Sequence, residues 1–133
     1  MASERGSFAD VRTGELAVAK TDEGPQVLTI TGEHDLSTAP ALRRCLDGLL
    51  SERDAIIVDL TSATFIDSSI LGAILDGRKR ASDAGIGYAV VHANGQDAVG
   101  RVLDVTGLRA ELPVHPAQKD AVAALAVNSG NST

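Results

Sequence analysis

Residues 55–72, Ala-Ile-Ile-Val-Asp-Leu-Thr-Ser-Ala-Thr-Phe-Ile-Asp-Ser-Ser-Ile-Leu-Gly, decide the fold of this chain. The run 55–60 is almost continuously apolar, which is typical of a strand covered on both faces of a sheet. Residues 67–69 then bring an acid and two hydroxyls to the start of a segment with helical spacing, so we expect a helix over 68–84. A buried strand followed by a helix is the repeating unit of α/β folds.

The sequence on either side continues this alternation of strands and helices. We expect strands at 16–20, 27–32, 55–60, 86–92 and near 111–114, and helices that begin at 37 or 38, at 68, after Asn94 and at Pro116. The pattern predicts an α/β single domain over residues 14–126, in which a mixed, mostly parallel sheet with an N-terminal antiparallel hairpin carries about four helices. Residues 1–13 and 127–133 lack periodicity, and we expect them to be flexible ends.

The composition disfavours several classes of partner. The formal net charge of −6 repels phosphate backbones, and the chain has only three aromatic residues on which bases could stack. Both features argue against direct binding of nucleic acid. No apolar run is long enough to span a bilayer and no signal peptide is evident, so we expect a cytoplasmic protein without a membrane partner. The single cysteine, Cys45, lies on the apolar face of an expected helix, where it serves as a small buried side chain.

Two loops should meet at the carboxyl ends of the strands, where ligands bind in open α/β sheets. One loop, 32–37, carries Glu33 and Asp35, and the other, 62–68, carries Asp67 and Ser68. The residues alone leave three uses open: helix caps, a catalytic pair or a metal site. The G-x-S-x-G pattern of serine hydrolases, paired metal-ligand spacings and the glycine-rich phosphate loops are all missing, so we expect no catalytic residue, no metal and no cofactor.

Three segments together resemble the STAS domain family of bacterial anti-sigma factor antagonists. They are Thr-Gly-Glu-His-Asp-Leu-Ser-Thr-Ala-Pro at 31–40, Phe-Ile-Asp-Ser-Ser-Ile-Leu-Gly at 65–72 with the strand at 57–60 before it, and Gly-Arg-Val-Leu-Asp-Val-Thr-Gly-Leu at 100–108. The resemblance covers about residues 16–126 in the expected order. It implies a protein that acts by binding, not by catalysis.

What the resemblance implies is a phosphorylation switch. In the family the unphosphorylated antagonist binds an anti-sigma factor, often a serine kinase, and thereby regulates transcription that depends on a sigma factor. The acceptor serine maps onto Ser68, while Ser69 matches the neighbouring hydroxyl and is the less favoured acceptor. A PP2C-type phosphatase restores binding in the family, and Asp35 and Asp67 match acidic positions near the acceptor.

The helix after Ser68 is a second candidate for partner binding. On a helical wheel, Ser69, Ala73 and Asp76 lie opposite the expected buried stripe, and Ile70, Ala73 and Gly77 share a flank of mostly small residues. This flank could receive a partner or a second copy in a homodimer, or it could pack on a neighbouring helix of the same chain. Ile70 stands where the family usually has glycine, and His34 where it usually has an aliphatic residue.

Two other functions remain open from the sequence. The first is a STAS interaction or ligand-binding module that is not switched by phosphorylation. The second, least favoured, is a serine hydrolase that uses Ser68.

Overall fold

The computed structural model of this 133-residue chain describes residues 14–93, 95 and 97–131, with side chains described as far as Ala126. The strands are β1 (Glu15–Lys20), β2 (Gln26–His34), β3 (Ile56–Asp59), β4 (Ala63–Ile66), β5 (Tyr88–Val91) and β6 (Val114–His115). The helices are α2 (Ala39–Glu52), α3 (Ser68–Ala84), α4 (Ala98–Val105), α5 (Leu108–Glu111) and α6 (Gln118–Asn131).

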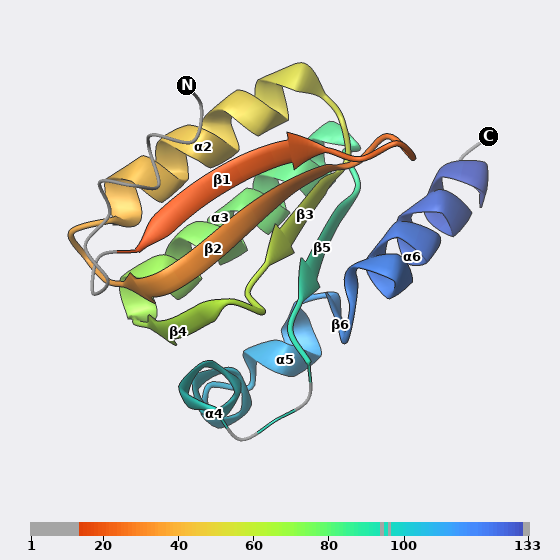
Figure 1. The fold of residues 1–133 in the computed structure, drawn as a ribbon. Helices are drawn as coiled ribbons and strands as arrows, with labels where there is room; N and C mark the ends of the chain where they lie inside the picture. Colours follow the sequence, from red (N-terminus) through yellow and green to blue (C-terminus); the bar gives the residue numbers. More distant parts are fainter. Residues whose placement is uncertain (1–13, 94, 96, 132–133) are drawn as a thin grey trace.

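These strands form one mixed, mostly parallel sheet in the order β1-β2-β3-β5-β6 (Figure 1). Only the β1–β2 hairpin is antiparallel, while β2–β3, β3–β5 and β5–β6 pair in parallel. β4 stands off this path and pairs in parallel with the carboxyl end of β2. The predicted α/β fold with an N-terminal antiparallel hairpin is confirmed.

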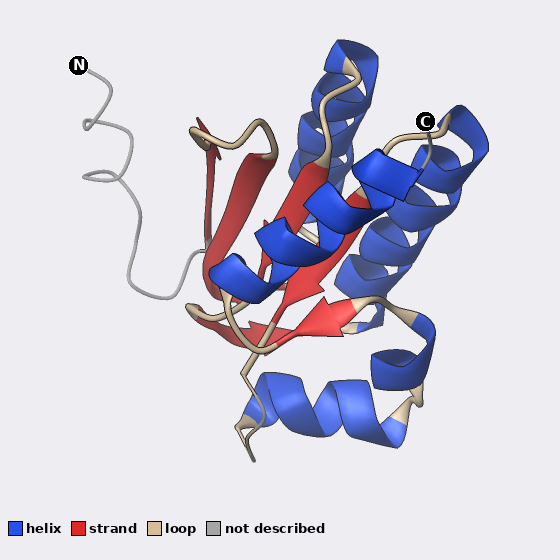
Figure 2. Ribbon diagram, turned by 90° about the vertical axis from the view of Figure 1, so that its right-hand side faces the viewer, coloured by secondary structure: helices blue, strands red, loops and turns tan. Residues whose placement is uncertain are grey.

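The two faces of the sheet are covered by different helices (Figures 1 and 2). Alternate strand residues such as Leu28 and Val58 join the larger apolar cluster with α2 and α3, whereas Val27 and Ile57 face the smaller cluster under α6. Because β3 is buried at every position, it shows the continuous apolar run that the sequence displays. The short helices α4 and α5 lie at the carboxyl ends of the strands, and α4 packs against β4.

The boundaries of α3 follow from its two caps. Asp67 accepts hydrogen bonds at the N-terminus, and Gly85 adopts a left-handed φ of 75° at the C-terminus, where a side chain would be strained. The predicted start at Ser68 and the stop at Gly85 are therefore both correct. The predicted helix after residue 38 is also present, as α2.

The structure departs from the sequence-based expectations at the C-terminal half and at β4. The strand expected near 111–114 is instead the one-turn helix α5 followed by the two-residue strand β6, so the described chain has five helices. Helix α4 is capped by Asp97 and begins at Ala98, and Asn94, which was expected to precede it, lies outside the described residues. The last helix continues to Asn131, beyond the expected end near residue 126, and β4 occupies part of the expected 62–68 loop.

Candidate functional site

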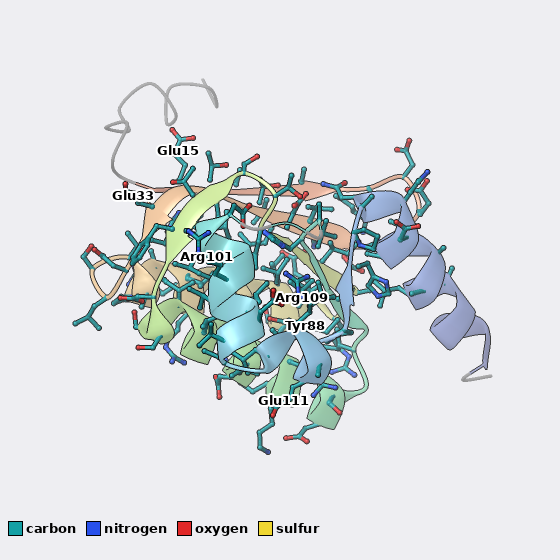
Figure 3. The ribbon with its side chains drawn as sticks, turned by 90° about the horizontal axis from the view of Figure 1, so that it is seen from below. Glu15, Glu33, Tyr88, Arg101, Arg109 and Glu111 are labelled. Atoms are coloured by element: carbon teal, nitrogen blue, oxygen red, sulfur yellow. The ribbon has the colours of Figure 1, made fainter. Side chains whose placement is uncertain are left out.

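The two acidic loops meet at the carboxyl ends of β2 and β4. His34 is the register partner of Ile66, so the residues that follow each strand lie beside one another. The loop after β2 supplies Asp35, and the turn after β4 supplies Asp67 and Ser68. Figure 3 shows Glu33 at this edge of the molecule, close to β4.

Asp67 organises the second turn through a single carboxylate oxygen. Its Oδ1 accepts hydrogen bonds from the Ser69 amide at 3.0 Å, the Ile70 amide at 3.2 Å and the Ser69 hydroxyl at 2.6 Å. The Ser69 hydroxyl is the main cause that lowers the pKa of Asp67, and the amides of Ile70, Ser69 and Leu36 lower it further against the opposing effect of burial. Leu36 belongs to the other loop, so the two loops lie close to one another here.

Asp35 builds the same arrangement in the first loop. Its Oδ1 accepts from the Ser37 amide at 2.9 Å and from the Ser37 hydroxyl at 2.6 Å. These two bonds, the hydroxyl first, lower the pKa of Asp35, whereas the nearby charge of Asp67 acts to raise it. Both acids therefore stay ionised at neutral pH and concentrate negative charge around Ser68.

The two serines of the turn have different roles. The Ser69 hydroxyl is engaged by Asp67, and its side chain is partly covered. Ser68 is exposed at the first position of α3, and within the described part of the chain its hydroxyl makes no hydrogen bond. Of the pair, Ser68 is the hydroxyl that remains open to another molecule.

Three residues that we expected to contact a partner are buried in the structure, and for them the prediction is wrong. Ile70 is 0% exposed and Ala73 is 1% exposed, and both belong to the larger apolar cluster. A Cβ atom at Gly77 would lie 2.9 Å from the Tyr88 hydroxyl and 3.2 Å from a Leu46 methyl. This flank of α3 therefore packs on α2 and β5, which confirms the alternative that it faces its own chain.

Asp76 is exposed as expected, but it is engaged within the protein. Its carboxylate lies 3.6 Å from the Arg43 guanidinium of α2 and 3.9 Å from that of Arg80. It belongs to a charged surface between α2 and α3 and lies two turns along the helix from Ser68.

His34 takes a structural position. Its ring is 1% exposed, with Nε2 3.0 Å from the Thr31 carbonyl oxygen and Nδ1 3.1 Å from the Thr38 hydroxyl. Gly14 lies so close to the ring that a Cβ there would come within 2.0 Å of Nε2. His34 thus fixes the start of the Asp35 loop, and its hydrogen bonds go to groups other than Ser68.

Two exposed apolar side chains beside Ser68 were missed by the sequence analysis. Leu36 is 72% exposed and Phe65 is 42% exposed. Phe65 faces outward because the β2–β4 register shifts between Gly32 and Glu33, so that Ala63 pairs with Gly32 while Phe65 pairs with Glu33. Thr64 is the extra residue of this bulge, and no signal in the sequence marks it.

The described residues meet the requirements of neither a metal site nor a membrane span. Across the described ranges, no three His, Cys, Asp or Glu side chains gather as a metal site. His92 lies 3.2 Å from an Asp97 carboxylate oxygen and 3.3 Å from the Arg109 guanidinium, so its ring is engaged at the α4–α5 end. Within the same ranges, no helix is both long and apolar enough to cross a bilayer.

Comparison with known families identifies this architecture. The sequence profile of the STAS domain matches residues 17–121, which is most of the chain. The chain belongs to the STAS domain family. The family resemblance of the 31–40, 65–72 and 100–108 segments is thereby confirmed.

A curated relative and several solved structures resemble this chain over most of its length. The chain is 32% identical to an anti-sigma F factor antagonist of Paenibacillus polymyxa over 108 residues. This matched region covers 80% of this chain and 91% of the relative. The crystal structure of an anti-sigma factor antagonist from Mycobacterium paratuberculosis superposes with a TM-score of 0.75 at 25% identity, covering 89% of this chain and 98% of that one. The structure of the Bacillus cell fate determinant SpoIIAA in its phosphorylated form has the same fold, with a TM-score of 0.64 at 17% identity over 84% of this STAS chain and 99% of that one.

Proposed function

We propose that this protein is an anti-sigma factor antagonist that binds an anti-sigma factor when Ser68 is unmodified and releases it when Ser68 is phosphorylated. The observation that carries the proposal is the Ser68 hydroxyl, which is exposed and makes no hydrogen bond among the described residues, while its neighbour Ser69 is engaged by Asp67. The names of the Paenibacillus and Mycobacterium relatives support the role as antagonist. The protein acts in the cytoplasm by binding, and the anti-sigma factor is itself the serine kinase.

The electrostatics of the turn explain how a phosphate would act. A phosphoserine carries a charge of about −1.5 to −2 at neutral pH. At Ser68 this charge would join Asp67 and Asp35 and would need to lose water when a partner covers the turn, and both effects oppose docking. The N-terminus of α3 tolerates the phosphate, so the fold persists while the interface is lost.

A direct test uses the purified protein with each anti-sigma factor encoded in the source genome. We expect one of them, with Mg²⁺ and ATP, to phosphorylate the protein at Ser68, located by mass spectrometry, and a PP2C-type phosphatase to remove the phosphate. Ser68→Ala should keep binding and lose phosphorylation, Ser68→Asp should weaken binding, and the matched Ser69→Ala variant should still be phosphorylated.

Each contrary result points to another function. Stable binding without transfer to Ser68 would favour an unswitched STAS module. Ester hydrolysis by the purified protein that disappears in Ser68→Ala would favour a hydrolase. Binding to none of the anti-sigma factors would refute the proposal.

A further inference from the structure

The two turns at the site share one geometry, and each projects its middle residue outward. In the first turn the Ser37 hydroxyl donates to the Asp35 carboxylate at 2.6 Å. In the second turn the Ser69 hydroxyl donates to the Asp67 carboxylate at the same distance. The middle residues are Leu36, which is 72% exposed, and the exposed Ser68. The first turn therefore presents a large apolar side chain in the way that the second presents the candidate phosphoacceptor.

This exposure of Leu36 is built into the loop. Asp35 and Ser37 fix the turn, the Thr38 hydroxyl accepts from the Asp35 amide at 3.2 Å, and the buried His34 fixes its start. A side chain on a fixed turn loses less conformational freedom on binding than one on a mobile loop. Leu36 is thus preorganised for contact with another surface.

Phe65 adds a second apolar group on the neighbouring strand. Its register partner is Glu33, and both side chains are exposed, whereas the next pair along the strands, His34 and Ile66, is buried. Phe65 precedes the Asp67 turn by two residues, and Leu36 lies on the neighbouring loop, whose start is paired with β4 through His34 and Ile66. The two apolar groups therefore lie on the two adjoining segments that meet at the Ser68 turn.

The charged side chains that the two loops themselves carry are all acidic. Segments 31–42 and 61–72 contain the exposed Glu33 and Asp35 and the half-buried Asp67, and neither segment contains Lys or Arg. Arg101 of the adjacent α4 limits the acidic area on one side (Figure 3). A complementary partner would be positively charged where it meets these carboxylates.

We propose that Leu36 and Phe65 are the apolar anchors of a docking surface around Ser68, and that its occupant is the anti-sigma factor through an apolar pocket bordered by Lys and Arg. This inference rests on the proposed function and adds the chemistry of the partner. It also gives the switch a mechanism, because a phosphate on Ser68 would lie on the turn that adjoins both anchor-bearing segments and would hold water where the partner must exclude it.

The test uses the anti-sigma factor that binds the wild-type protein, without ATP, and measures Kd by isothermal calorimetry. Leu36→Ser and Phe65→Thr should each weaken binding at least about tenfold, as expected for buried anchor residues. The control is Val18→Ser, because Val18 is 45% exposed and pairs with Leu28, roughly 20 Å along β2 from His34. The control should bind within about twofold of wild type, and raising NaCl from about 0.05 to about 0.5 M should weaken binding of the wild-type protein.

Unfolding curves of all variants establish that each is folded, and Leu36 is exposed enough that its replacement leaves the core intact. If phosphorylation of Ser68 proceeds and both anchor variants bind as well as wild type, the inference is overturned while the proposed function stands. Self-association through these residues, seen by sedimentation, would assign the surface to a second copy and would also overturn it. Failure of every anti-sigma factor to bind the wild-type protein would overturn both.

Discussion

Replacement of Asp67 separates its role as a helix cap from its role as a charge. Asp67→Ala removes the three hydrogen bonds that Oδ1 accepts from the Ser69 amide, the Ile70 amide and the Ser69 hydroxyl. Loss of an aspartate N-cap costs about 1 kcal/mol, and loss of the bond to the hydroxyl adds roughly 0.5 to 1 kcal/mol. We expect the free energy of unfolding to fall by about 1.5 to 2 kcal/mol, which lowers Tm by roughly 5 °C for a chain of this size.

The pH dependence of this loss follows from the lowered pKa of Asp67. A carboxyl whose pKa is lower in the folded state contributes stability that is complete above its unfolded pKa of about 3.9. That contribution disappears as the pH falls through the folded pKa. The difference between wild type and Asp67→Ala should therefore be full at pH 7 and should shrink below about pH 4, measured by urea unfolding followed by circular dichroism.

Asp67→Asn is the matched control, because asparagine caps helices about as well as aspartate but carries no charge. We expect its stability at pH 7 to lie between those of wild type and Asp67→Ala, because it keeps the capping bonds but loses the part that depends on the carboxylate charge. Equal unfolding curves for wild type and Asp67→Ala at pH 7 would refute the capping argument. A loss in Asp67→Asn as large as that in Asp67→Ala would show that the charge, and not the hydrogen-bond geometry, stabilises the turn.

Two further predictions concern the neighbours of this turn and the buried flank of α3. Ser69→Ala should raise the pKa of Asp67, because the Ser69 hydroxyl is the main group that lowers it; an unchanged value in a carboxyl NMR titration would contradict this reading. Gly77→Ala should destabilise the protein by about 1 kcal/mol, since overpacking against the Tyr88 hydroxyl, 2.9 Å from the new Cβ, outweighs the gain in helix propensity. In a Tyr88→Phe background the cost should be smaller in urea unfolding, and equal costs in the two backgrounds would rule out this contact as the cause.

The sequence predicted well those elements whose pattern is set by local chemistry. The continuous apolar run of β3 and the caps at Asp67 and Gly85 are local signals, and the structure places the elements where they indicate. β4 was missed because its bulge leaves a burial pattern that is neither continuous nor alternating, and α5 was missed because a single helical turn shows no repeated period. Their positions depend on pairing with β2 and on packing beside α4.

The candidate site was predicted in part for the same reason. Asp35, Asp67 and Ser68 are recognisable in the sequence because the turns that hold them are local. Helical periodicity groups Ile70, Ala73 and Gly77 on one flank, but it cannot say whether that flank meets solvent or α2. Because α3 packs on both α2 and the sheet, its buried arc is wider than its large apolar side chains indicate, and it includes small residues.

The bulge at Thr64 determines which side chains of β4 face outward. With that extra residue, Phe65 lies opposite Glu33 and faces outward, while Ile66 lies opposite His34 and faces inward. If the same strand paired with β2 without the bulge, Phe65 would take the inward position two residues after Ala63, and Ile66 would take the outward one. The backbone irregularity at Thr64 therefore decides which of two adjacent apolar side chains this edge of the sheet presents to another molecule.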